Sequence, residues 1–183
     1  MDPDMTKPPP AVPGDDKDWT WVLESDCPEC GFSAQEFVKE DVAAMIRSNA
    51  LEWITVLGGD ERTVTKRRDP ALWSTLEYGC HVRDVHVLYL ERLELMLAED
   101  GPHYANWDQD ITAVESRYDL AEPSAVAGEL VTAAEALASR FESVVGDQWQ
   151  RTGYRSDGAA FTVETFAKYF IHDPIHHMWD VRR

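Results

Sequence analysis

The stretch Tyr169-Phe-Ile-His-Asp-Pro-Ile-His-His-Met-Trp179 holds three of the chain's six histidines, His172, His176 and His177. Four residues advance about 400° around a helix, so His172 and His176 are expected on one helical face, one turn apart. Neutral imidazole is the commonest metal ligand among side chains, and two stacked imidazoles can hold one ion from one side. The stretch therefore predicts a helix that supplies two metal ligands, and at least one more must come from elsewhere.

Four stretches of the sequence have the apolar spacing and the end signals of long helices. In the first, the capping pattern Ser33-Ala-Gln-Glu36 marks the start and Gly58-Gly59 marks the end. The second carries a broad apolar stripe, and the third begins with a proline at a tolerated first-turn position. We expect helices over residues 33–57, from 70 or 74 to 98, 123–145 and 162–180.

The connections between these helices also indicate the fold. Residues 99–121 form one long crossover, and Ser156-Asp-Gly158 predicts a tight turn or a short hairpin before the last helix. Four long helices with one long crossover predict an all-α fold, a four-helix bundle. In such bundles, side chains on facing helices can build a metal site inside the core.

The length and composition place limits on the domain organisation. At 183 residues the chain can bury one full hydrophobic core, and residues 1–17 hold five of its ten prolines with few apolar side chains. We expect a flexible tail over 1–17 and a single domain over 18–183. There is no apolar run of about 20 residues for a membrane span and no recognisable secretory signal, and three cysteines are too few for a disulfide framework. The expected location is the cytoplasm, with no membrane partner.

The charge excludes one class of partner. A formal net charge of −17 would repel a phosphate backbone, so we expect no nucleic-acid binding. The sequence also has no glycine-rich phosphate loop and no Gly-x-Ser-x-Gly elbow, which argues against nucleotide and serine-hydrolase sites.

Three other histidines are candidates for the third metal ligand. His103 follows Pro102 in the long connection and is the weakest of them. His81 and His86 are five residues apart on one predicted helix, so they point about 140° from one another and cannot face the same core site. The carboxylate of Asp84 could accept a hydrogen bond from the outer ring nitrogen of His81, a common arrangement around a metal ligand, although a single histidine more often has a structural role. His86 lies among apolar residues and fits a core or interface position.

Taken together, these motifs resemble the DinB-like superfamily, four-helix bundle proteins that include the metal-binding domain of mycothiol-dependent maleylpyruvate isomerases. The resemblance covers roughly residues 33–181. It rests on a tryptophan-led helix with His81-Val-Arg-Asp84, on His172-x-x-x-His176, and on Asp157-Gly158 and Phe161-Thr-Val163 before the last helix.

This resemblance implies that His81, His172 and His176 bind one divalent metal ion. Zinc is the first choice, and nickel or iron would also accept imidazoles. Three protein ligands leave a coordination position open, as in catalytic sites. Because several relatives use a low-molecular-weight thiol, the resemblance implies a transferase or isomerase that uses mycothiol or a similar thiol on a small electrophile, as a homodimer. It assigns no catalytic residue beyond the metal ligands.

The sequence departs from the family pattern after His172. Family members often carry a glutamate there, whereas this chain has Asp173-Pro174. A proline inside a helix cannot donate the backbone hydrogen bond and is expected to bend it. The bend could orient His172 and His176, or it could bring His177 into the place of His176.

Two further alternatives are left open by the sequence. The protein could be non-enzymatic, a stress-response or interaction protein whose metal ion only stabilises the bundle. Separately, Cys27-Pro-Glu-Cys30 supplies half of a four-ligand zinc site, and no second cysteine pair exists. This segment is predicted to be a turn with two thiols, with a metal half-site or a regulatory disulfide as the alternatives.

Overall fold

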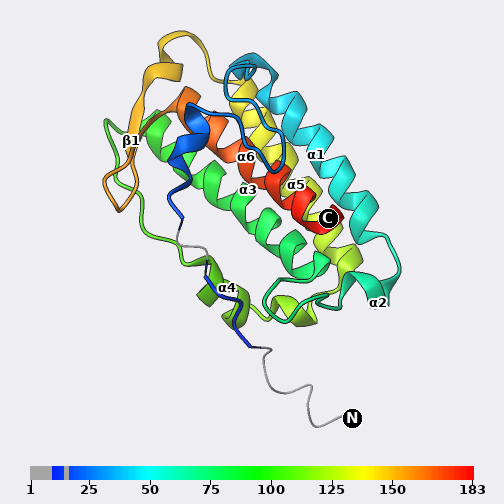
Figure 1. The fold of residues 1–183 in the computed structure, drawn as a ribbon. Coiled ribbons are helices and arrows are strands. Elements are labelled where there is room, and N and C mark those ends of the chain that lie inside the picture. Colours follow the sequence, from blue (N-terminus) through cyan, green and yellow to red (C-terminus); the bar gives the residue numbers. More distant parts are fainter. Residues whose placement is uncertain (1–9, 15–16) are drawn as a thin grey trace.

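The computed structural model describes residues 10–14 and 17–183. Its four long helices are α1 (Val42–Leu57), α3 (Thr75–Ala98), α5 (Pro123–Glu142) and α6 (Val163–Arg182), which run alongside one another in Figure 1. Each of α1 and α3 packs against both α5 and α6. The predicted all-α four-helix bundle is therefore confirmed. Within the described residues, no helix is both long enough and apolar enough to cross a membrane.

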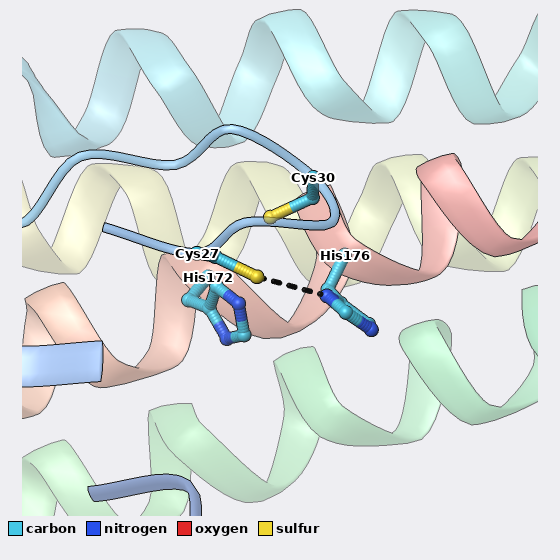
Figure 2. Close-up of side chains that lie close together, drawn as sticks. All are labelled: Cys27, Cys30, His172 and His176. Carbon is cyan, nitrogen blue, oxygen red and sulfur yellow. Dashed lines mark hydrogen bonds between the residues drawn. The ribbon is translucent and has the colours of Figure 1, made fainter. Parts of the chain in front are cut away.

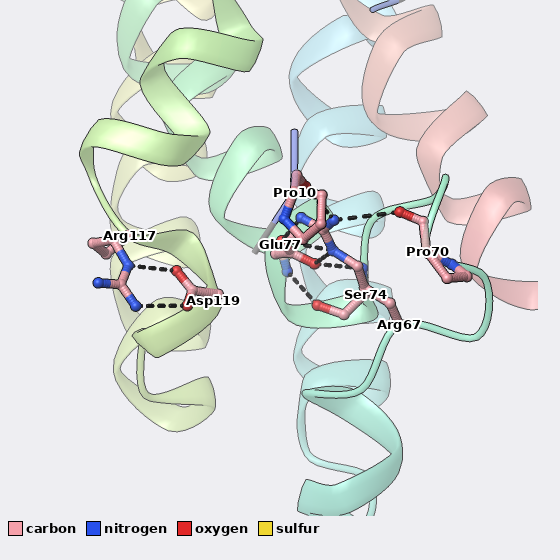
Figure 3. Close-up of polar contacts among 7 residues, drawn as sticks. All are labelled: Pro10, Arg67, Pro70, Ser74, Glu77, Arg117 and Asp119. Atoms are coloured by element: carbon pink, nitrogen blue, oxygen red, sulfur yellow. Dashed lines mark hydrogen bonds and ion pairs between the residues drawn. The ribbon is translucent and has the colours of Figure 1, made fainter. Parts of the chain in front are cut away.

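The start of α3 is fixed by a capping box. The Ser74 side chain accepts a hydrogen bond from the Glu77 backbone N–H, and the Glu77 carboxylate accepts one from the Ser74 N–H. Glu77 also pairs with Arg67, and Arg67 Nη1 donates to the carbonyl of Pro10 at 2.8 Å (Figure 3). This network joins the N-terminal segment to the beginning of α3. Figure 3 also shows the separate pair of Arg117 and Asp119.

The first long helix begins later than predicted. The backbone N–H of Glu36 does donate to Ser33 Oγ at 3.4 Å, but this bond closes an isolated turn. Val38 is extended (φ −113°, ψ 119°), and it separates that turn from the short 3₁₀ helix η3 (Lys39–Asp41) that leads into α1. The capping pattern was therefore correct as a local contact and wrong as a helix start. The predicted end of the helix at Gly58 is confirmed.

Between α3 and α5, the long connection contains the short helix α4 (Gln109–Glu115) and the 3₁₀ helix η4 (Tyr118–Leu120). Between α5 and α6, the 3₁₀ helix η5 (Gly146–Gln150) leads to a two-stranded antiparallel hairpin, β1 (Thr152–Tyr154) and β2 (Ala160–Thr162). Gly158 turns this hairpin with φ 91°, a conformation that favours glycine. The short hairpin suggested by the sequence is present.

The last helix continues through its internal proline. Residues 163–182 are helical, and the carbonyl of Pro174 accepts a hydrogen bond from Asn49 Nδ2 of α1 at 3.2 Å. On the other side of α6 lies the 3₁₀ helix η2 (Trp19–Leu23). The short helix α2 (Glu61–Val64) connects α1 to α3. The predicted flexible tail falls mainly on residues 1–9 and 15–16, which lie outside the described residues.

Candidate metal centres

Helix α6 carries two pairs of potential metal ligands on adjacent faces. Asp173 and His177 are four residues apart, and so are His172 and His176. Each pair is therefore stacked along the helix, and the two pairs are rotated from each other by about 100°. They face different neighbours, and each belongs to a separate group of ligand atoms that lie within 4.8 Å of one another.

The first group, here called the His81 site, consists of His81 from α3 and Asp173 and His177 from α6. His81 Nε2 lies 3.5 Å from Asp173 Oδ1, and His177 Nε2 lies 3.9 Å from the same oxygen. His81 is fully buried, whereas the other two side chains are partly exposed. The group therefore joins two helices of the bundle at the edge of its core.

Several polar atoms of the His81 site have no hydrogen-bond partner. Both ring nitrogens of His81 and Oδ1 of Asp173 are buried, and none of them has such a partner within the part of the chain that the structure describes. Burial lowers the pKa of His81, against the attraction of Asp173. Burial would raise the pKa of Asp173, but the neighbouring His177 and His81 hold it well below its usual value. A neutral imidazole beside an ionised carboxylate is the protonation state that binds metals.

His177 is oriented by a second carboxylate. Its Nδ1 lies 3.0 Å from Asp180 Oδ2, while its Nε2 faces Asp173. This is the usual arrangement of a metal-binding imidazole, in which a carboxylate holds the outer nitrogen and the inner nitrogen faces the ion. The residues of the His81 site therefore fit a divalent metal ion, with two nitrogen ligands and one oxygen ligand.

A cavity of about 610 Å³ opens beside this group. Asp173 and His177 line it, together with the aromatic residues Trp73, Tyr78 and Trp107. The Trp107 ring stacks on His81 with ring centroids 5.6 Å apart. A volume of this size and an aromatic wall suit a small organic molecule.

The second group, here called the Cys27 site, consists of Cys27, Cys30, His172 and His176. In Figure 2 the two sulfur atoms and the two rings lie around one space between the N-terminal loop and α6. Cys27 Sγ lies 3.6 Å from His176 Nδ1. Both cysteines are free thiols. Burial lowers the pKa of His172 to about 4, and His176 adds to this effect.

The three histidines predicted as ligands of one ion lie in two groups. His172 and His176 lie together, with ring centroids 5.1 Å apart, whereas His81 lies with Asp173 and His177. All three stay candidate ligands, and His177, the alternative to His176, is in the His81 group. The predicted hydrogen bond between His81 and Asp84 is wrong, because Asp84 is engaged by Arg83 and Tyr118.

The two remaining histidines lie outside both groups. His86 is fully buried, and its Nδ1 lies 2.7 Å from the carbonyl oxygen of Val82, so it is the core residue that the sequence suggested. His103 stacks on Tyr154 beside the hairpin.

Two features of the candidate sites were missed by the sequence reasoning. In the sequence, Asp173 stands out only as a departure from the family pattern, although it is a potential ligand four residues before His177. The second half of the Cys27 site was sought in another cysteine pair, although His172-x-x-x-His176 has the spacing of a zinc-binding histidine pair. This spacing is therefore the signal in the sequence for the Cys27 site, but it fits an ion shared with His81 equally well.

The comparisons with known proteins agree with this fold. The DinB superfamily model matches residues 44–181. The chain belongs to the DinB superfamily. Among solved structures, the fold is similar to that of YfiT from Bacillus subtilis, described as a probable metal-dependent hydrolase with an unusual four-helix bundle topology. The TM-score is 0.72 at 17% identity, and the match covers 83% of this chain and 92% of YfiT. No curated protein sequence matches the chain at a significant level.

Proposed function

We propose that this DinB-superfamily protein is a metal-dependent enzyme, with its catalytic ion bound by His81, Asp173 and His177. The observation that carries the proposal is the buried ring nitrogens of His81 and the buried Oδ1 of Asp173, which have no hydrogen-bond partner among the described residues and lie beside a cavity of about 610 Å³. Two imidazoles and a carboxylate form a known ligand set of catalytic zinc. The same set binds non-haem iron, and nickel also accepts imidazoles, so elemental analysis must decide the metal.

The proposed reaction is the attack of a low-molecular-weight thiol, such as mycothiol, on a small electrophile. A divalent ion with an open coordination position would hold the thiol as its nucleophilic thiolate. The protein's own residues would orient the second substrate. Tyr78 lines the cavity, and burial raises its pKa to about 12, so its hydroxyl keeps its proton at neutral pH and can donate to a substrate oxygen. Trp73 and Trp107 line the cavity and would supply apolar walls for the second substrate.

Calorimetric titration of the metal-loaded protein with mycothiol tests this proposal. Binding is expected for the wild type and for His103→Ala, whose histidine lies outside both groups. His81→Ala should lose one equivalent of metal and the thiol binding while it stays folded. An absence of thiol binding at millimolar concentration, with the metal intact, would overturn the thiol reaction. Unfolding of His81→Ala would instead favour a non-enzymatic protein whose metal stabilises the bundle.

Hydrolysis is a second candidate reaction, because the similar fold of YfiT is described as that of a probable metal-dependent hydrolase. Water would then replace the thiol as the nucleophile at the same ion. Thiol-independent turnover of activated esters or amides, lost in His81→Ala, would favour this candidate. Turnover that requires an added thiol would exclude it.

A further inference from the structure

We propose that Cys27, Cys30, His172 and His176 form a second metal site, a closed tetrahedral zinc site that fastens the N-terminal segment to α6. It shares no ligand with the His81 site. The four ligand atoms all lie within 4.8 Å of one another. Two cysteines and two histidines are a common ligand set of structural zinc, with the spacings Cys-x-x-Cys and His-x-x-x-His that this chain has.

The measured separation of the ligand atoms fits one zinc ion. With zinc–sulfur and zinc–nitrogen bonds of about 2.3 and 2.05 Å, tetrahedral geometry places sulfur and nitrogen about 3.6 Å apart. Cys27 Sγ and His176 Nδ1 are separated by 3.6 Å. The buried Nε2 of His172 has no hydrogen-bond partner among residues 10–14 and 17–183. The group thus has the dimensions of a metal site, and one of its potential ligand atoms, His172 Nε2, is buried without a hydrogen-bond partner in the described part of the chain.

The loop that carries the cysteines is shaped to present both sulfurs. The Gly31 N–H donates to the carbonyl of Cys27 at 2.9 Å, and the Cys27 N–H donates to the carbonyl of Phe32 at 2.8 Å. Gly31 has φ 76°, which a residue with a side chain rarely adopts. This turn brings Cys27 and Cys30 to the same side of the loop, facing α6 (Figure 2).

The outer nitrogen of His176 also has the surroundings of a metal ligand. While Nδ1 faces Cys27, Nε2 lies 3.5 Å from Oε2 of Glu29, one of the two residues between the cysteines in the loop. A carboxylate behind the ring fixes its orientation and strengthens the inner nitrogen as a donor. The same loop therefore supplies two ligands and the support for a third.

Charge balance favours a dication at this site. On binding, each thiol would release its proton to solvent, and the two thiolates would cancel the charge of Zn²⁺. The two histidines would bind as neutral imidazoles. Four protein ligands leave no open position, so this ion would be structural and would not bind substrate.

The site would also shape the cavity of the His81 site. Trp19 packs on His172 and His176, with ring centroids 5.5 and 4.9 Å apart, and Trp19 and Glu29 line the cavity. A zinc ion that holds residues 27–30 against α6 would therefore hold one wall of the cavity in place.

Cobalt substitution of the full-length protein tests the proposal. Co²⁺ bound to thiolates gives a charge-transfer absorption in the near ultraviolet that histidine and carboxylate ligands do not give. The apo protein should bind two equivalents of Co²⁺ and show this absorption. Asp173→Asn should lose one equivalent and keep the absorption, whereas Cys27→Ser with Cys30→Ser should lose the other equivalent together with the absorption.

Cys80→Ser is the matched control, because Cys80 is a buried free thiol of α3 that belongs to neither group. It should keep both equivalents and the absorption. If the double cysteine variant does not fold, alkylation of the wild type replaces it: Zn²⁺ should protect Cys27 and Cys30 from iodoacetamide, and a chelator should expose them. Cobalt binding without thiolate absorption, or alkylation unaffected by Zn²⁺, would overturn the proposal. Neither outcome would contradict the separate proposal of a metal ion at the His81 site.

Discussion

At the scale of single residues, Asp180 is the side chain that orients His177, since its Oδ2 lies 3.0 Å from the Nδ1 of that ring. Replacement of Asp180 by asparagine removes the negative charge and keeps the shape of the side chain. We expect metal affinity at the His81 site to fall by about 10- to 100-fold, because such partners of ligating histidines have effects of that size.

A competition titration with a chromogenic chelator would measure this change. Glu52→Gln is the matched control, because the Glu52 carboxylate also pairs with a residue of α6, Arg182, but contacts neither metal group. Equal affinities of Asp180→Asn and wild type would show that Asp180 has no part in the site.

The buried His86 predicts a pH dependence of stability. Burial lowers its pKa from 6.5 to about 4, although its bond to Val82 and the charge of Asp173 oppose this. Between these values the unfolded chain binds a proton at this residue and the folded chain does not, so stability falls as the pH falls. The effect of this residue is about 1.4 kcal/mol per pH unit, or about 3 kcal/mol over the whole window.

Chemical denaturation at several pH values, with a chelator present, would test this effect. His86→Gln should be less stable than wild type near neutral pH, and the difference should shrink as the pH falls towards 4. A constant difference across the window would show that folding does not lower the pKa of His86.

At the scale of the helices, two glycines predict opposite effects of the same substitution. A Cβ on Gly79 of α3 would lie 2.9 Å from Leu57 Cδ2, in a buried side chain of α1. Apart from its chain neighbours and the nearby backbone of α5, a Cβ on Gly128 would meet no described atom within 4 Å. Gly128→Ala should stabilise the protein by about 1 kcal/mol through helix propensity. Gly79→Ala should destabilise it by about 1–2 kcal/mol, because overpacking outweighs that gain.

Thermal or urea denaturation of the two alanine variants measures both values. If Gly79→Ala stabilises the protein, α1 and α3 can move apart without a loss of stability. That result would contradict tight packing of Leu57 against this glycine.

The helices also show which parts of the fold were predictable. Local signals such as Gly58 at the end of α1 and Ser74 with Glu77 at the start of α3 were correctly interpreted, because the atoms involved are neighbours in the chain. The start of α1 was predicted wrongly. The turn at Ser33 satisfies the same capping pattern, but its loop packs against α6 through Phe32 and His172.

The candidate sites were predictable in composition but not in grouping. Helix α6 offers two stacked pairs, one starting at His172 and one at Asp173, and both have the required four-residue spacing. Which pair faces His81 depends on the rotation of α6 against α3, and tertiary packing alone sets that rotation. The role of Cys27 depends on the same rotation of α6, because this rotation turns His172 and His176 towards the N-terminal loop.

At the scale of the whole molecule, the bundle and the N-terminal segment should differ in their need for metal. The four long helices share a continuous apolar core, whereas residues 18–32 lie on α6 through contacts of η2, which includes Trp19, and of Cys27. We expect a chelator to leave the helical circular dichroism almost unchanged and to make residues 18–32 sensitive to limited proteolysis. Equal cleavage patterns with and without metal would contradict a role for metal in holding this segment.

The central claim is that one divalent ion lies between His81, Asp173 and His177, where the cavity meets the core. Anomalous diffraction from crystals of the zinc-loaded protein, measured on both sides of the zinc edge, tests it most directly. The account predicts a peak within bonding distance of His81 Nε2, His177 Nε2 and a carboxylate oxygen of Asp173. Zinc-loaded crystals with no peak at these three side chains, or with a single ion shared by His81, His172 and His176, would contradict it.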